Sequence, residues 1–224
     1  MKQLLLDFTR APAPTFANFV PGHNAELASA LEAAARGEIA EPVIYMWGES
    51  AAGKTHLAKA FAEAAATRAR YQPGEAAAFD ALAPGTMLAL DDIERLSEER
   101  QVALFNAFNA RRFGFLLVSA RAAPRDVALR RDLATRLATG LTYRILPLTD
   151  EEKRAALAAH AHARGFTLTE EVSAYLLTHA RRDMGSLVAA LDALDRYSLE
   201  TGRPITVPLL RAALQPELPM GRTP

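Results

Sequence analysis

The residues best suited to chemistry lie in one glycine-rich stretch, which matches the pattern G-x-x-x-x-G-K-[ST] at every fixed position. Its glycines let backbone N–H groups turn toward phosphate oxygens, and a helix that starts there adds free N–H groups and its positive dipole end. Lys54 is expected to reach the β and γ phosphates of a nucleotide, and Thr55 to ligate Mg²⁺. The stretch therefore predicts a site for ADP or ATP with Mg²⁺. The residues predicted to bind the nucleotide here are Gly48, Glu49, Ser50, Ala51, Ala52, Gly53, Lys54, Thr55 and His56.

The residues around this loop supply the setting that the motif needs. The apolar run from Val43 to Trp47 is typical of a buried parallel strand, and a helix-like stretch from His56 to Ala66 follows the loop. The alternative is a chance glycine-rich turn. A strand directly before the motif and a helix directly after it favour the phosphate-binding loop.

Two acids follow a second apolar run, Met87 to Leu90. Ligands of α/β sheets gather at the carboxyl edge of the strands, so we expect Asp91 to hold Mg²⁺ through water and Asp92 to orient an attacking water. The alternative is an acidic cap of a strand end. Ser119, at the end of a third predicted strand, is expected at the level of the phosphates. The turn Val20-Pro21-Gly22 is a candidate wall for the nucleotide base.

Strands alternate with helices up to residue 146, which predicts a parallel, doubly wound α/β domain over residues 15–146. Asn24 is expected to cap the first helix. From Thr149 on only helical patterns appear, which predicts an all-helical lid domain over 147–216, with a tail at 217–224. The elements expected are strands at 43–47, 70–71, 87–92, 113–119 and 141–146, and helices at 24–36, 54–67, 75–81, 98–112, 125–137, 149–164, 169–181, 183–201 and 207–215. In the helix at 98–112, the side chains expected to face inward are Val102, Phe105, Ala107 and Phe108.

Composition narrows the class of protein. The 224 residues include 26 basic and 26 acidic side chains, and this zero net charge argues against DNA binding as the main activity. There are no cysteines, which fits a reducing compartment. No apolar stretch approaches the ~20 residues of a membrane span, and the N-terminus lacks the apolar region of a secretory signal. A cytoplasmic protein is expected.

The motifs together are similar to those of the AAA+ family that contains the bacterial replication initiator DnaA and its shortened relative, the regulatory inactivator Hda. The stretches that carry the resemblance are Thr15-Phe-Ala-Asn-Phe-Val-Pro-Gly-His-Asn24, Gly53-Lys-Thr-His-Leu57, Asp91-Asp-Ile93, Leu104-Phe-Asn-Ala-Phe-Asn109, Ala134-Thr-Arg-Leu137, Leu146-Pro-Leu-Thr-Asp-Glu-Glu-Lys153 and the helix from Arg182 to Arg196. The resemblance implies a P-loop AAA+ sheet domain with a small C-terminal lid.

Residues 1–14 resemble a peptide and tether that dock on the bacterial sliding clamp, the β subunit of DNA polymerase III. The peptide Gln3-Leu-Leu-Leu-Asp-Phe8 follows the clamp-binding pattern, with clamp contacts expected from Gln3, Leu4, Leu6 and Phe8. The alternative is a strand that packs on its own domain. The inactivator carries its clamp peptide in this place, which favours docking. The sequence shows neither the initiator's partner-binding domain before the sheet nor its DNA-binding domain after the lid, so no sequence-specific DNA binding is expected.

The resemblance places Arg136 at the position of the arginine finger, which completes the nucleotide site of a neighbouring subunit and suits a γ-phosphate. The alternative is a surface arginine in an ion pair. The family's sensor arginine falls on Gly185, and its acidic residue after the strand-end serine falls on Ala120. Both changes remove groups that sense the γ-phosphate. They predict slow intrinsic ATP turnover, with ADP as the expected resident nucleotide.

These observations predict a negative regulator of replication initiation. It would bind nucleotide, dock on the DNA-loaded clamp and stimulate ATP hydrolysis by DnaA through Arg136. The alternative is a free-standing AAA+ ATPase, such as a helicase loader. AAA+ domains and clamp peptides both favour self-association, so the oligomeric state stays open.

Overall fold

The computed structural model describes residues 12–80 and 82–214. The predicted clamp peptide, with Gln3, Leu4, Leu6 and Phe8, and the tail after residue 214 lie outside the described residues. The chain divides into two compact units, one formed by residues 14–147 and the other by the residues from 148 on. Each unit has a hydrophobic core of its own.

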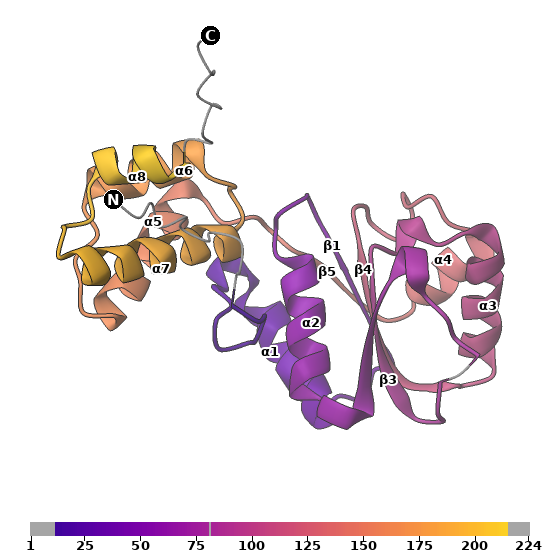
Figure 1. The fold of residues 1–224 in the computed structure, drawn as a ribbon. Helices are drawn as coiled ribbons and strands as arrows, with labels where there is room; N and C mark the ends of the chain where they lie inside the picture. The colour runs from indigo at the N-terminus through magenta and orange to yellow at the C-terminus, as the bar shows by residue number, and fades with distance from the viewer. Residues whose placement is uncertain (1–11, 81, 215–224) are drawn as a thin grey trace, which may run out of the picture. The chain divides into compact units, whose positions relative to one another are not determined.

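The first unit is a three-layer α/β domain (Figure 1). Its five strands pair in parallel in the order β2-β3-β4-β1-β5, which confirms the predicted parallel sheet. The helices and strands, in chain order, are α1 (Ala25–Arg36), β1 (Val43–Trp47), α2 (Lys54–Ala64), β2 (Ala69–Pro73), β3 (Thr86–Asp91), α3 (Glu98–Asn109), β4 (Phe113–Ala120), α4 (Arg131–Leu137) and β5 (Leu141–Arg144). Short 3₁₀ turns are η1 (Gly22–Asn24), η2 (Ala66–Arg68), η3 (Gly74–Ala76) and η4 (Ile93–Arg95).

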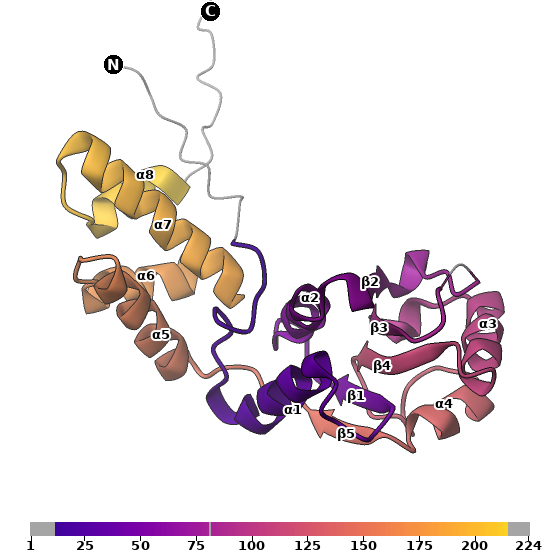
Figure 2. The same cartoon turned by 90° about the horizontal axis from the view of Figure 1, so that it is seen from below.

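Two apolar layers hold the helices to the two faces of the sheet. Leu31 of α1 and Phe61 of α2 belong to the core on one face. Leu104 of α3 and Leu133 of α4 belong to the core on the other face. Figure 2 shows the strands between these helix pairs. Because all strands run the same way, the segments that leave β1, β3 and β4 emerge along one edge, which we call the carboxyl edge.

Four details differ from the elements that the sequence predicts. The helix expected at 125–137 begins only at Arg131. The helix expected at 75–81 is wrong, because only the 3₁₀ turn Gly74–Ala76 forms there. β5 ends at Arg144 instead of residue 146. Val102 is 37% exposed, so it does not face the core; Leu104 and Ala107 are the buried apolar side chains of α3.

The second unit is all helical in its described part. It consists of α5 (Asp150–Ala163), α6 (Glu170–His179), α7 (Met184–Thr201) and α8 (Val207–Leu214). Thr149 caps α5: its hydroxyl accepts the Glu152 N–H at 3.1 Å, and the Glu152 carboxylate accepts the Thr149 N–H at 2.8 Å. Among the described helices, none has both the length and the hydropathy needed to cross a membrane.

Candidate nucleotide-binding site

The loop between β1 and α2 closes around the amine of Lys54. Its Nζ donates to the carbonyl oxygens of Gly48 and Glu49, each at 2.7 Å, and the residue is only 7% exposed. The loop therefore encloses a fixed positive charge at the carboxyl edge, in the place where the motif predicts phosphate binding.

Two glycines of the loop are required by the geometry. A Cβ on Gly48 would lie 2.3 Å from the carbonyl oxygen of Ile145, a backbone atom that cannot move aside. Gly53 has a φ of +104°, a conformation that favours glycine. The sequence pattern fixes these two positions, and the structure gives a steric or conformational reason for each.

The start of α2 supplies the donors that a polyphosphate needs. The first backbone hydrogen bond of the helix runs from the Leu57 N–H to the Gly53 carbonyl at 3.0 Å. The N–H groups of Lys54, Thr55 and His56 precede that bond and lie at the positive end of the helix dipole. Thr55 is exposed beside them. This donor set fits the phosphates of a nucleotide.

Burial of the Lys54 amine lowers its pKa from the ordinary value of 10.5. The carboxylates of Asp92, Glu94 and Asp91 oppose this shift because they favour the charged amine, while Arg121 adds to it. A nucleotide phosphate at the amine would act in the same sense as the acids. A bound phosphate would therefore stabilise the protonated form of the Lys54 amine.

Asp91 is held by hydrogen bonds to both of its oxygens. The Tyr71 hydroxyl of β2 donates to Oδ2 at 2.9 Å, and the Ser119 hydroxyl of β4 donates to Oδ1. Ser119 Oγ also accepts the Asp92 N–H at 2.9 Å. Burial and the nearby Asp91 carboxylate raise the pKa of Tyr71. Ser119 is fully buried, so its hydroxyl positions the two acids.

The candidate base wall lies in the segment before η1. Val20 is half-buried, and Pro21 and Gly22 are exposed. The preceding residue, Phe19, packs on the loop: a Cβ on Gly53 would lie 3.0 Å from Phe19 Cε2. The sequence does not predict this contact of Phe19, since an aromatic residue in an irregular segment gives no local sign of its partner.

His56 joins this segment to the loop through its side chain. Its Nε2 lies 2.9 Å from the Thr15 carbonyl oxygen, and its ring centroid lies 5.5 Å from that of Phe19. Burial lowers the pKa of His56. The neutral ring can donate through Nε2 to the carbonyl, so the side chain of His56 anchors residues 15–19. The group of His56 that is left for a phosphate is its backbone N–H at the start of α2.

Asn24 does not cap α1 with its side chain, which corrects the sequence prediction. Its Nδ2 donates to the Leu146 carbonyl and its Oδ1 accepts the Leu146 N–H, each at 2.8 Å. This amide clasp ties the segment with the candidate base wall to the backbone that follows β5. The clasp spans 122 residues, so no local pattern could have indicated it.

Arg136 lies far from this site, at the opposite edge of the sheet. It is exposed near the end of α4, shortly before Gly140, whose Cβ would lie 2.4 Å from the Val43 carbonyl oxygen. Val43 begins β1, and the phosphate loop follows the other end of that strand. Arg136 therefore cannot complete the nucleotide site of its own chain.

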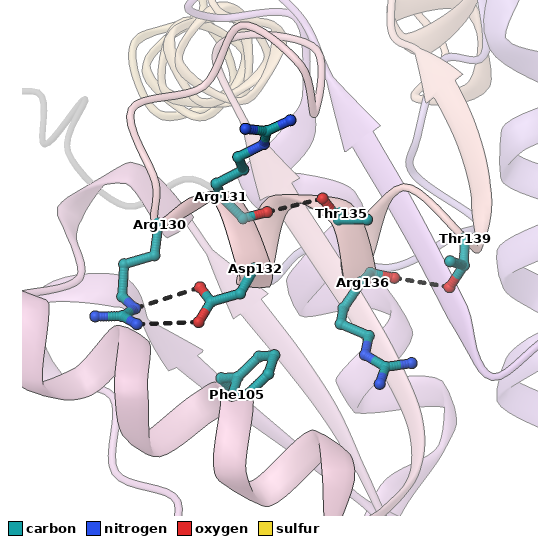
Figure 3. Close-up of a pocket in the computed structure, with 7 residues that line it drawn as sticks. All are labelled: Phe105, Arg130, Arg131, Asp132, Thr135, Arg136 and Thr139. Atoms are coloured by element: carbon teal, nitrogen blue, oxygen red, sulfur yellow. Dashed lines mark hydrogen bonds and ion pairs between the residues drawn. The ribbon is translucent and has the colours of Figure 1, made fainter.

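A surface pocket of about 820 Å³ surrounds Arg136 (Figure 3). Within the described residues Arg136 makes no ion pair, whereas Arg130 binds Asp132 with two hydrogen bonds of 3.0 and 3.3 Å. Phe105 of α3, which the sequence analysis places in the core, lines this pocket although its ring also packs partly against the core. The pocket residues are Phe105, Arg130, Arg131, Asp132, Thr135, Arg136 and Thr139.

The position onto which the resemblance places the sensor arginine belongs to the second unit. Gly185 lies in the first turn of α7 and carries no side chain. The neighbouring arginines have partners inside that unit: Arg181 pairs with Asp183 at 3.5 Å, and Arg182 pairs with Asp150 at 2.7 Å. Over the residues with known placement, no group of three or more His, Asp or Glu side chains could hold a metal ion by itself.

Residues 150–214 match the family model described as the lid domain of Hda. An uncharacterised protein of Haemophilus influenzae is 32% identical over 228 residues, which cover 95% of this chain and 98% of that protein.

The α/β unit and lid together resemble solved structures of replication initiators. Domain III of Thermotoga maritima DnaA superposes with a TM-score of 0.68 at 22% identity, covering 93% of this chain and all of that one. AMPPCP-bound DnaA from Aquifex aeolicus gives a TM-score of 0.64 at 19% identity, covering 88% of this chain and 68% of that one. At these identities the superpositions establish the fold.

Proposed function

Because this chain belongs to the DnaA-related AAA+ proteins that include Hda, we propose that it is a negative regulator of replication initiation. It binds a nucleotide in its own loop, docks on the DNA-loaded sliding clamp and stimulates ATP hydrolysis by DnaA. It activates hydrolysis of the ATP that DnaA holds and does not turn over ATP significantly itself. It acts in the cytoplasm, where replication takes place. It does not act by reading DNA sequence.

The observation that carries this proposal is the position of Arg136. It is exposed and without an ion pair among the described residues, at the sheet edge opposite its own phosphate loop. A guanidinium so placed does not face the phosphates of its own chain and is free to contact another molecule, and its planar fork can bind phosphate oxygens through two N–H groups. An arginine supplied in trans to a developing phosphoryl charge is worth roughly 10³–10⁵ in rate.

The chain's own loop is proposed to hold ADP as a resident nucleotide. Lys54 would contact the phosphates, and the N–H groups at the start of α2 would surround them. Mg²⁺ keeps several waters and takes one or two protein oxygens besides those of phosphates. Thr55 and Asp91 would supply these oxygens, Asp91 through water. The glycine at position 185 supports slow turnover, since it offers no side chain to a γ-phosphate.

Clamp docking is proposed for Gln3, Leu4, Leu6 and Phe8. A short peptide binds weakly, at about the micromolar level, but a flexible link raises the local concentration of the attached domain. Replacing Gln3 and Phe8 with Ala should abolish clamp binding in a pull-down with purified clamp. Nucleotide affinity, measured in parallel, should stay unchanged. Retained clamp binding would remove this part of the proposal.

The whole proposal is tested by following labelled ATP that is pre-bound to DnaA. Addition of this protein together with DNA-loaded clamp should accelerate conversion of that ATP to ADP. The alternative, a free-standing AAA+ ATPase such as a helicase loader, predicts the reverse: robust turnover by the isolated chain and no acceleration on DnaA. Measuring both rates with the same preparation separates the two functions.

A further inference from the structure

Arg121 leaves the sheet at the centre of the carboxyl edge. It directly follows β4, which lies between β3 and β1 in the sheet. On one side are Asp91 and Asp92 at the end of β3. On the other side is the phosphate loop, whose Gly48 N–H donates to the carbonyl of Ala120 at 3.2 Å. The backbone of Arg121 therefore lies between the two acids and the phosphate loop.

The partner of Arg121 is Glu94, in the 3₁₀ turn η4 that follows the two acids. Arg121 Nε lies 3.3 Å from Glu94 Oε1, an ion pair that lacks hydrogen-bond geometry. Both carboxylate oxygens of Glu94 are shielded from solvent, and neither has a hydrogen-bond partner among the described residues. Buried polar atoms normally have partners, so these two oxygens call for an explanation.

The two side chains of this pair differ in exposure. The Arg121 side chain is 67% exposed and that of Glu94 is 19% exposed. The closest approach uses Nε, and a guanidinium has further N–H groups on its two Nη atoms. Glu94 can therefore hold the guanidinium at Nε while the two Nη groups remain open to solvent and to a ligand.

The charges of this pair also reach the amine of Lys54. Glu94 favours the charged amine and Arg121 disfavours it, which places both within electrostatic range of Lys54. An anion bound at Lys54 would thus lie in the field of a second cation. That cation sits on a strand end where Ala120 offers no polar group.

We propose that Arg121 binds the terminal phosphate of the nucleotide held by its own chain, and that Glu94 positions it through Nε. The inference rests on the proposed nucleotide binding and adds a phosphate-contacting residue and a positioning residue to that site. The third phosphate of ATP offers extra charge and oxygens to the guanidinium fork, so the contribution of Arg121 to affinity should be larger for ATP than for ADP, whichever nucleotide the whole loop holds more tightly. In this proposal Glu94, a carboxylate next to a phosphate site, acts by orienting the arginine.

The test is equilibrium binding of fluorescent ADP and ATP analogues to the full-length protein, with Mg²⁺ present and no clamp or initiator. Arg121→Ala should weaken ATP binding about tenfold and ADP binding much less, as expected for one charge-assisted contact. Glu94→Gln should reduce the ATP-to-ADP preference in the same direction because the fork loses its anchor. Arg121→Lys keeps the charge and should recover part of the preference.

Arg125→Ala is the matched control. Arg125 lies four residues further along, is 88% exposed and pairs with Asp126, so its removal should change neither affinity. Thermal unfolding of each variant checks that the fold is intact. Equal ATP-to-ADP ratios for wild type and Arg121→Ala would overturn the inference while the proposed function stands. A wild-type protein that binds neither nucleotide would remove both.

Discussion

The two edges of the parallel sheet are built in opposite ways. At the carboxyl edge the amine of the phosphate loop and the acid at the end of β3 are enclosed and already engaged: Lys54 is 7% exposed and Asp91 is 3% exposed, and both are hydrogen-bonded within the chain. At the other edge Arg136 is exposed, without an ion pair in the described structure, beside a surface pocket.

This contrast indicates two kinds of recognition. An enclosed, prearranged set of donors suits a small ligand that replaces internal contacts with its own oxygens. An open arginine suits a ligand presented by another molecule, which supplies the missing walls. Under the proposed function, the same AAA+ domain holds one nucleotide at the first edge and acts on a second at the other.

The largest predicted effect comes from breaking the enclosed edge alone. Lys54→Ala removes the amine that the loop surrounds and should weaken nucleotide binding at least about 100-fold, since charge-assisted contacts to two phosphates are lost. Isothermal titration with ADP measures this. Lys59→Ala is the control on the same helix, because Lys59 is exposed and lies over the Tyr71 ring. Unchanged affinity in Lys54→Ala would contradict the assignment of the loop.

A middle-sized effect should come from the amide clasp behind the candidate base wall. Asn24→Ala leaves the Leu146 N–H and carbonyl without their partners and should lower the free energy of unfolding by about 1–3 kcal/mol. Chemical denaturation of the full chain measures it. Asn106→Ala, on the exposed face of α3, is the control and should have little effect. Equal stability of the two variants would show that the clasp is not important for folding.

The smallest predicted effect is the pH dependence that His56 adds. Burial lowers its pKa from the ordinary 6.5 in the folded protein, so the unfolded chain binds the proton more tightly. The free energy of unfolding should therefore fall as pH drops from 6.5 toward the lower folded value, and level off below it.

His56→Gln isolates this contribution, because the amide can still donate to the Thr15 carbonyl but cannot titrate. The difference between wild type and variant should shrink or change in favour of the variant between pH 7 and pH 5. All other titratable groups are common to both proteins, so their contributions cancel in the difference. A pH-independent difference would mean that His56 contributes nothing through its proton.

The sequence predicts the phosphate loop well because its chemistry is local. Gly48, Gly53 and Lys54 lie within seven consecutive residues, and the spacing itself imposes the turn and the helix start. The alternation of strands with helices also follows from local apolar runs, whereas the strand order β2-β3-β4-β1-β5 is set by tertiary packing and is not predicted from the sequence. In the loop and in this alternation, local pattern and final structure agree.

What the sequence does not predict depends on contacts between distant segments. The Asn24 clasp to Leu146, the Tyr71 bond to Asp91 and the Glu94 pair with Arg121 each join residues from different elements. The prediction that Val102 faces inward is wrong for a related reason. In a short helix with several apolar faces, periodicity alone cannot decide which face meets the sheet.

The central claim is that Arg136 acts on a nucleotide held by another molecule. The most direct measurement is single-turnover hydrolysis of labelled ATP pre-bound to DnaA, in the presence of DNA-loaded clamp. Arg136→Ala should lose the stimulation, a fall of about 10³-fold or down to the rate of DnaA alone, while still binding nucleotide and clamp. Arg136→Lys should recover little, because the planar fork is lost.

The control is Arg36→Ala, which removes an exposed arginine from α1 on the opposite face of the sheet and should stimulate like wild type. Stimulation that survives in Arg136→Ala would contradict the claim. Stimulation that disappears in Arg136→Ala alone would establish that this edge of the sheet serves the partner's nucleotide.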